Sequence, residues 1–119
     1  YRESVYCHRG SWDFWSGISE PVIKDFPTPQ LTSEPQYHWG SGDGPKLPDQ
    51  EISFCSHLPV TELISIAQKH IAACGYSPST SKNHDTLVFT SGSKTLYIHV
   101  ASVADGKTQL DATLLFDDY

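Results

Sequence analysis

The clearest pattern of apolar positions lies between residues 59 and 76, where apolar side chains recur at spacings of three and four. This spacing places them along one side of an α-helix and leaves polar residues on the other side. Pro59 suits the first turn of such a helix, and Gly75 suits its end because glycine readily adopts the left-handed conformation that closes the last turn. The apolar stripe consists of Val60, Leu63, Ile64, Ala67, Ile71 and Cys74. We therefore predict a helix that covers a hydrophobic core.

Four segments alternate between apolar and polar residues, as β-strands do. They are residues 51–57 before the helix, and residues 86–90, 95–101 and 108–116 after it. Turns at residues 91–94 and at Asp105 and Gly106 separate the last three segments. The predicted order is β-α-β-β-β, an antiparallel three-strand meander that the first strand joins through a right-handed helical crossover. We predict an α+β fold with a four-stranded, mostly antiparallel sheet and one helix on one of its faces.

A period of two assigns each strand residue to one face of this sheet. The helix side is apolar and holds Ile52, Phe54, Leu87, Phe89, Leu96, Ile98, Val100, Leu110, Ala112 and Leu114. The second face is mixed and holds Ser53, Cys55, His57, Val88, Thr90, Tyr97, His99, Asp111, Thr113 and Leu115. It could be solvated, covered by the N-terminal segment or used for binding, and we favour the covered arrangement.

Residues 1–50 show no sustained helix or strand periodicity, and they contain all three tryptophans and six of the eight prolines. We interpret them as an irregular, turn-rich segment. So many aromatic rings would be unfavourable in water, which argues against a disordered tail. We expect this segment to wrap the core formed by residues 51–119, with its tryptophans docked on the second face, in a single domain of residues 1–119.

The net charge of −6 and the scattered basic residues do not favour binding to nucleic acid or to anionic membranes, but they suit a basic protein partner. No apolar run reaches the length of about 18 residues that a membrane span needs. The absence of methionine indicates a processed or truncated chain. Together with three cysteines, it favours an exported protein, periplasmic or extracellular, over a trimmed cytosolic one. The oligomeric state is left open.

The three cysteines are predicted to form one disulfide bond. Cys55 and Cys74 should not meet, because the helix holds them about 22 Å apart and directs them to different faces. Cys7 then pairs with Cys55 or with Cys74. Cys55 is favoured because it points to the face on which the N-terminal segment is expected, and Cys74 would be a buried thiol.

Few catalytic or metal-binding patterns occur in the sequence. Neither Cys7 with His8 nor Cys55 with His57 has the spacing of a zinc motif, so we predict no metal and no cofactor. Cys55 and His57 share a strand face but lie about 6–7 Å apart, which is too far for a nucleophile and its base. His99 and Asp111 lie on neighbouring strands of the second face, and we expect them either to be hydrogen-bonded to one another or to lie at the edge of a cleft.

These features favour a non-enzymatic, exported protein-binding module, such as an inhibitor, an immunity protein or an accessory subunit of an envelope assembly. Its predicted binding residues are Trp12, Trp15, His57, Tyr97, His99 and Asp111. One alternative is a carbohydrate or small-ligand module in which Trp12, Trp15 and Trp39 form a stacking platform. Another alternative is a small hydrolase that uses His99 and Asp111.

Overall fold

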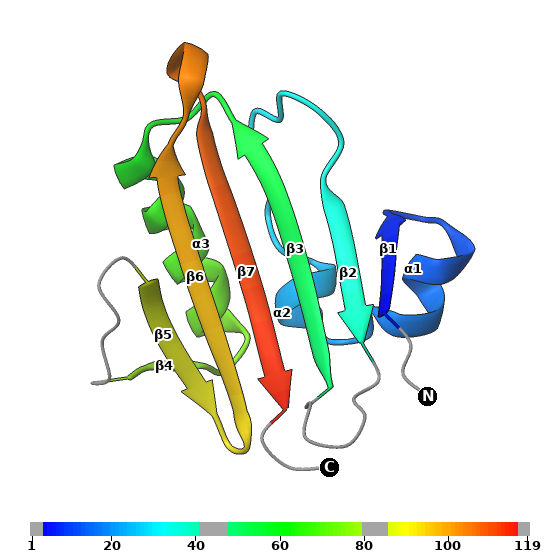
Figure 1. The fold of residues 1–119 in the computed structure, drawn as a ribbon. Coiled ribbons are helices and arrows are strands. Elements are labelled where there is room, and N and C mark those ends of the chain that lie inside the picture. Colours follow the sequence, from blue (N-terminus) through cyan, green and yellow to red (C-terminus); the bar gives the residue numbers. More distant parts are fainter. Residues whose placement is uncertain (1–3, 41–47, 80–85, 117–119) are drawn as a thin grey trace.

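The structure, a computed structural model, describes residues 4–40, 48–79 and 86–116. Within these ranges the chain forms one antiparallel sheet with the strand order β1-β2-β3-β7-β6-β5-β4 (Figure 1). The strands are β1 (Ser4–His8), β2 (Gln36–Gly40), β3 (Asp49–Ser56), β4 (Ser77–Pro78), β5 (Thr86–Ser91), β6 (Lys94–Ser102) and β7 (Thr108–Phe116). The helices are α1 (Trp12–Gly17), α2 (Pro21–Lys24) and α3 (Val60–Ala73), with a short 3-10 turn, η1 (Ala104–Gly106), between β6 and β7.

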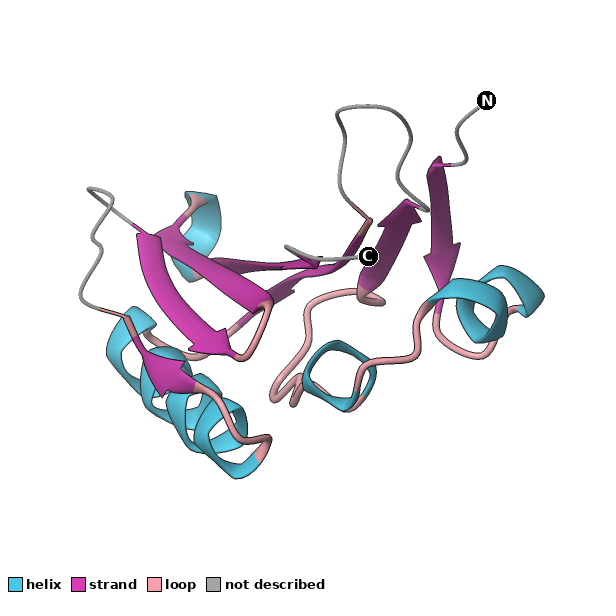
Figure 2. Cartoon of the chain, turned by 90° about the horizontal axis from the view of Figure 1, so that it is seen from below, coloured by secondary structure: helices cyan, strands magenta, loops and turns pink. Residues whose placement is uncertain are grey.

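The helices α1, α2 and α3 all lie on one side of the sheet (Figure 2). Helix α1 packs against β1 and β2, α2 packs against β3, and α3 packs against β6. No described helix covers the opposite side, which is the second face of the sequence analysis and which we call the open face. None of the helices in the described ranges has the length and apolar character needed to cross a membrane.

The predicted helix and its C-terminal boundary are confirmed. Leu63, Ala67 and Ile71 of α3 are buried. Gly75 adopts a φ of 90°, and the Tyr76 backbone N–H donates to the Ile71 carbonyl at 3.2 Å, which closes the last turn. Tyr76 itself folds back and is only 7% exposed.

The four predicted strands are also present, but the prediction of a four-stranded sheet is wrong. Strands β5, β6 and β7 form the expected meander, and β3 joins it at β7. The segment interpreted as irregular supplies β1 and β2, which extend the sheet beyond β3. At the other edge, β4 follows α3 directly and pairs with β5. The strands β1, β2 and β4 span only five, five and two residues, too few for a periodicity of two to stand out.

The N-terminal segment covers the helix side of the sheet rather than the second face. Its apolar residues Phe14, Ile18, Val22, Ile23 and Phe26 are buried in the same core as the α3 stripe. Tyr37 of β2 is paired with Ile52 of β3, and both side chains enter this core. The strand register confirms the assignment to the helix side, because Leu87 is opposite Ile98 and Val100 is opposite Leu110. These two residues are only less buried than the others, with Leu87 39% exposed and Val100 partly buried.

Three contacts explain why the chain follows this path before β2 and β3. Ser11 caps α1 by accepting a hydrogen bond from the Phe14 backbone N–H at 3.2 Å. At the end of α1, Gly17 lies so close to Trp39 that a Cβ atom would be 2.1 Å from the indole ring. The Trp39 Nε1–H also donates to the carbonyl of Asp13 at 2.9 Å. Trp39 therefore holds α1 against the helix side of the sheet, and not the second face as predicted.

A buried glutamine fixes the turn between α1 and α2. The Gln50 side-chain oxygen accepts from the backbone N–H groups of Ser19, at 3.2 Å, and Glu20, at 3.0 Å, and its amide donates to the Ser19 hydroxyl at 3.1 Å. Because Gln50 is only 6% exposed, this polar side chain needs those partners. The N-terminal helices are thus tied to β3 by hydrogen bonds as well as by apolar packing.

The predicted disulfide bond between Cys7 and Cys55 is not present. Cys7, Cys55 and Cys74 are free thiols, and no two of them are at disulfide distance. The reason is the path of the N-terminal segment, which places Cys7 in the core on the helix side while Cys55 lies on the open face. Cys74, the alternative partner, packs at the edge of the core beside the His70 ring.

Candidate functional site on the open face of the sheet

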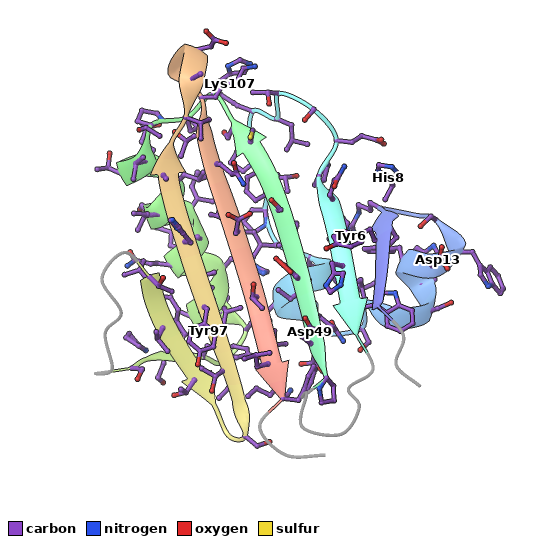
Figure 3. All side chains as sticks on the ribbon, in the orientation of Figure 1. Tyr6, His8, Asp13, Asp49, Tyr97 and Lys107 are labelled. Carbon is purple, nitrogen blue, oxygen red and sulfur yellow. The ribbon has the colours of Figure 1, made fainter. Side chains whose placement is uncertain are left out.

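The open face carries acidic side chains and histidines but no lysine or arginine from the described strands. Its carboxylates and imidazoles belong to Asp49 and Glu51 of β3, Asp111 of β7, His8 of β1, His38 of β2 and His99 of β6. Lys94 is the only basic residue other than histidine in these strands, and its ammonium pairs with Glu20 at 2.8 Å on the helix side. Figure 3 labels Tyr6 and Asp49 on the part of this face formed by β1, β2 and β3, and Tyr97 on β6.

Three of these side chains form a cluster between β2 and β3. The register places His38 directly opposite Glu51, and Asp49 lies two residues before Glu51, on the same face. The His38 Nδ1 atom is 3.7 Å from Asp49 Oδ2 and 3.7 Å from Glu51 Oε1. We call His38, Asp49 and Glu51 the histidine–carboxylate cluster.

Asp49 is the most buried carboxylate of the cluster. Its side chain is 9% exposed, and the side chain of Glu51 is 34% exposed. The Asp49 Oδ1 atom is buried and accepts no hydrogen bond from any residue in the described ranges. A buried carboxylate oxygen without a donor is unfavourable, and among the described residues nothing compensates the burial of this oxygen.

The environment of Glu51 disfavours its negative charge. Burial raises the pKa of Glu51, nearby His38 lowers it, and the charges of Asp111 and Asp49 raise it again. A hydrogen bond with the Thr113 side chain lowers the pKa, but the net direction is upward. A cation placed here would relieve the repulsion among these carboxylates.

Asp111 lies beside the cluster and is held by two polar neighbours. The Ser53 hydroxyl donates to Asp111 Oδ1 at 2.5 Å, and the Gln109 amide donates to the same oxygen at 3.3 Å. These contacts fix the orientation of the Asp111 carboxylate across β3 and β7.

A pocket of about 200 Å³ opens between the cluster and Asp111. It is lined by Tyr6, Gln36, Tyr37, His38, Glu51, Ser53 and Asp111. The Tyr6 ring lies against the His38 ring with a centroid distance of 4.5 Å, yet Tyr6 remains 76% exposed. The pocket thus has polar walls, an aromatic rim and carboxylates from two strands.

The residues predicted on the second face of the sheet lie there, but they do not form the expected pair. His99 is opposite Asp111 in the register of β6 and β7, and Tyr97 is opposite Thr113. Within the described residues no hydrogen bond or ion pair joins His99 to Asp111, and the buried His99 Nδ1 atom has no partner. Asp111 is bound to Ser53 and Gln109 instead. The geometry therefore lacks the contact that the hydrolase hypothesis requires.

The other predicted site residues lie away from this pocket. Trp12 and Trp15 belong to α1, where they are 85% and 58% exposed. The Trp15 ring contacts the Lys24 ammonium at 4.8 Å from its centroid. His57 follows the end of β3 and lines a separate hollow with Lys107 and Thr108.

The cluster residues were missed because residues 1–50 were interpreted as irregular. The alternation of Gln36, Tyr37, His38 and Trp39 is a short strand signal. Glu51 begins the predicted first strand, and Asp49 continues its alternation toward the N-terminus. Pairing these two segments would have placed His38 opposite Glu51.

A scan of protein families, a search of curated proteins and a search of solved structures each found no match to this chain.

Proposed function

We propose that this protein is a non-enzymatic binding module that recognises a basic partner protein through the open face of its sheet. One observation carries the proposal: the described strands present three carboxylates on this face and no lysine or arginine. Complementary charge increases the association rate and selects against acidic partners. The net charge of −6 reinforces the same preference over long range.

The arrangement of the face also supports a binding role. Ser53 and Gln109 hold Asp111 in place, so little side-chain freedom is lost when a cation binds to it. Tyr6, at the rim of the pocket, offers an exposed ring to an arginine or lysine of the partner. An inhibitor, an immunity protein or an accessory subunit would use a face of this kind. Export from the cytoplasm stays a prediction from the sequence, without support from the cysteines, which form no disulfide bond.

The proposal is tested by removing the acidic charge of the face. We would compare the wild-type protein with the Glu51→Gln/Asp111→Asn variant in binding to a panel of lysine- and arginine-rich peptides by fluorescence anisotropy. Affinity should fall about 2- to 30-fold, since each partly exposed ion pair contributes about 0.2–1 kcal/mol. Wild-type affinity should also fall as salt is added.

The matched control removes the same number of charges elsewhere. Glu62 at the start of α3 and Asp105 in η1 are exposed and lie outside the open face. The Glu62→Gln/Asp105→Asn variant should bind these peptides much as the wild type does. Equal losses in both variants would mean that only net charge matters, and unchanged binding in the first variant would refute a role for the open face.

The exposure of two tryptophans favours a second candidate function, binding of a carbohydrate by stacking. Trp12 and Trp15 are 85% and 58% exposed and are separated by one helical turn of α1, whereas Trp39 is packed against Gly17. Exposed indole rings are the usual platforms for sugar rings. Oligosaccharides that bind should protect tryptophan fluorescence from acrylamide, and Trp12→Ala should abolish this protection. If no oligosaccharide changes the quenching, the stacking hypothesis fails and the open-face proposal is unaffected.

A further inference from the structure

We propose that the histidine–carboxylate cluster of His38, Asp49 and Glu51 binds one divalent transition-metal ion, for which zinc is the best fit. The prediction of no metal rested on the spacing of cysteines and histidines along the chain. This site is instead assembled by strand pairing, from one residue of β2 and two of β3. Local spacing rules do not detect a site of this kind.

The spacing of the ligand atoms suits a small cation. One ligand atom from each of the three side chains lies within 4.8 Å of the other two, and His38 Nδ1 is 3.7 Å from each carboxylate. Around a tetrahedral zinc ion with bonds of about 2.0–2.2 Å, ligand atoms are about 3.3–3.6 Å apart. Small side-chain rotations would therefore bring the three atoms into coordination, with no movement of the strands.

The burial of Asp49 is an independent observation that points to a cation ligand at this cluster. The Asp49 side chain is 9% exposed and directs Oδ2 toward His38, while its buried Oδ1 atom has no hydrogen-bond partner among the described residues. Proteins rarely leave a buried carboxylate oxygen without a donor or a cation. A metal ion bound to Asp49 would supply that compensation.

The donor set indicates which metal ion would bind. An imidazole nitrogen and two carboxylate oxygens suit zinc and its neighbours, whereas magnesium and calcium prefer oxygen ligands alone. Three protein ligands leave at least one coordination position open. His38 and Glu51 line the pocket of about 200 Å³, so this open position would face the pocket and Asp111. The Tyr6 ring against His38 would help to hold the imidazole in its ligating orientation.

The test uses the full chain, reduced and freed of metal with a chelator that is then removed. Zinc, magnesium and calcium chlorides are titrated separately into the protein by isothermal titration calorimetry. We expect zinc to bind at this site with a stoichiometry of one, and magnesium and calcium to bind much more weakly. Asp49→Asn and Glu51→Gln should each weaken zinc binding by at least the 10- to 100-fold loss that follows removal of supporting groups around a metal.

Two further variants exclude binding at other histidines and thiols. Cys55→Ser and His99→Gln alter potential zinc ligands on the same face outside the cluster, and both should bind zinc as the wild type does. If either variant loses the site while Asp49→Asn retains it, zinc is bound elsewhere and the proposal is wrong. Absence of stoichiometric zinc binding to the wild type would overturn it as well.

Thermal unfolding separates a ligand role for Asp49 from a purely structural one. Zinc should raise the Tm of the wild type, because a metal that binds only the folded state stabilises it. Without zinc, Asp49→Asn should unfold at the same temperature as the wild type or higher, since it removes the charge of a buried carboxylate whose Oδ1 atom accepts no hydrogen bond from the described residues. The zinc-dependent rise should be absent from this variant and from Glu51→Gln. A full rise in both would refute the assignment, and since no partner protein is needed, the result is independent of the proposed function.

Discussion

Gly17→Ala should destabilise the protein by pushing the Trp39 ring away from α1. A methyl carbon at this position would lie 2.1 Å from two carbons of the indole ring, whereas unbonded carbons rest about 3.5–4.0 Å apart. The ring would have to move by at least about 1.4 Å, and the Trp39 hydrogen bond to the Asp13 carbonyl, now 2.9 Å long, would be lost. This close contact makes the variant a direct test of how the N-terminal segment docks.

The expected loss follows from three contributions. Overpacking costs about 1–3 kcal/mol and the lost hydrogen bond about 0.5–1.5 kcal/mol, while alanine favours the helix over glycine by about 1 kcal/mol. The free energy of unfolding should therefore fall by about 0.5–3.5 kcal/mol. Urea unfolding followed by circular dichroism measures it. Ser16→Ala, at the neighbouring exposed position of α1, is the control and should stay within about 0.5 kcal/mol of the wild type.

A double-mutant cycle isolates the contact between Gly17 and Trp39. In a Trp39→Leu background the ring is gone, so Gly17→Ala should cost much less than in the wild type. The reasoning is refuted if Gly17→Ala costs the same in both backgrounds, or if it is neutral in the wild type. Either result would mean that α1 does not pack against this ring.

Three further outcomes are expected. Gln50→Leu should lower the free energy of unfolding by about 2–4 kcal/mol because two backbone N–H groups lose their acceptor, whereas Gln50→Glu, which keeps an acceptor, should lose less in urea unfolding. The buried Tyr76 hydroxyl has no hydrogen-bond partner among the described residues, so Tyr76→Phe should stabilise the protein by about 1 kcal/mol. Burial, with smaller contributions from nearby acidic groups, raises the pKa of Tyr76 to about 12. The folded state therefore favours the neutral phenol. The stability that this group contributes below pH 10 should be lost in the wild type as the pH rises toward 12, and Tyr76→Phe should not show this loss. Mass spectrometry of protein treated with iodoacetamide should find three reactive thiols. Cys55 should be labelled before Cys7 and Cys74, because burial raises the pKa of the latter two thiols. A disulfide between any two of the cysteines would contradict the structure.

The part of the fold that was predictable from the sequence is the part with long periodic segments. Helix α3 spans 14 residues, and β6 and β7 span nine each, so their patterns repeat often enough to fix both the element and its buried face. Gly75 marked the helix end because only its left-handed conformation closes the turn. Such local signals do not depend on the rest of the chain.

The N-terminal segment was not predictable in this way because its structure depends on distant residues. Helices α1 and α2 span six and four residues, lengths that are unstable in isolation. They are held by Gln50 and Trp39, which lie in β3 and β2. Strand β2 exists because β3 offers it an edge, and its pattern of Tyr37 inward and His38 outward has meaning only in that pairing.

The candidate site was only partly predictable for the same reason. Asp111 and His99 were placed on the correct face from the period of the strands, but Ser53 and Gln109, not His99, hold the Asp111 carboxylate. The cluster required the register of β2 against β3, which places His38 opposite Glu51. Periodicity assigns a face to a residue, and only strand pairing assigns it a neighbour.

The position of β3 between β2 and β7 has a consequence for how the chain folds. Paired residues of β3 and β7 are separated by 52 positions in the sequence for Ser56 and Thr108, and by 66 positions for Asp49 and Leu115. The N-terminal strands and helices can attach only to the other edge of β3. Contacts this remote must wait for loop closure, which places the chain among the slower small domains, with folding in milliseconds to seconds. During synthesis, the apolar side of α3 lacks its partner until β6 leaves the ribosome, and β3 lacks its partner until β7 follows. This interval is when the nascent protein is most exposed to aggregation.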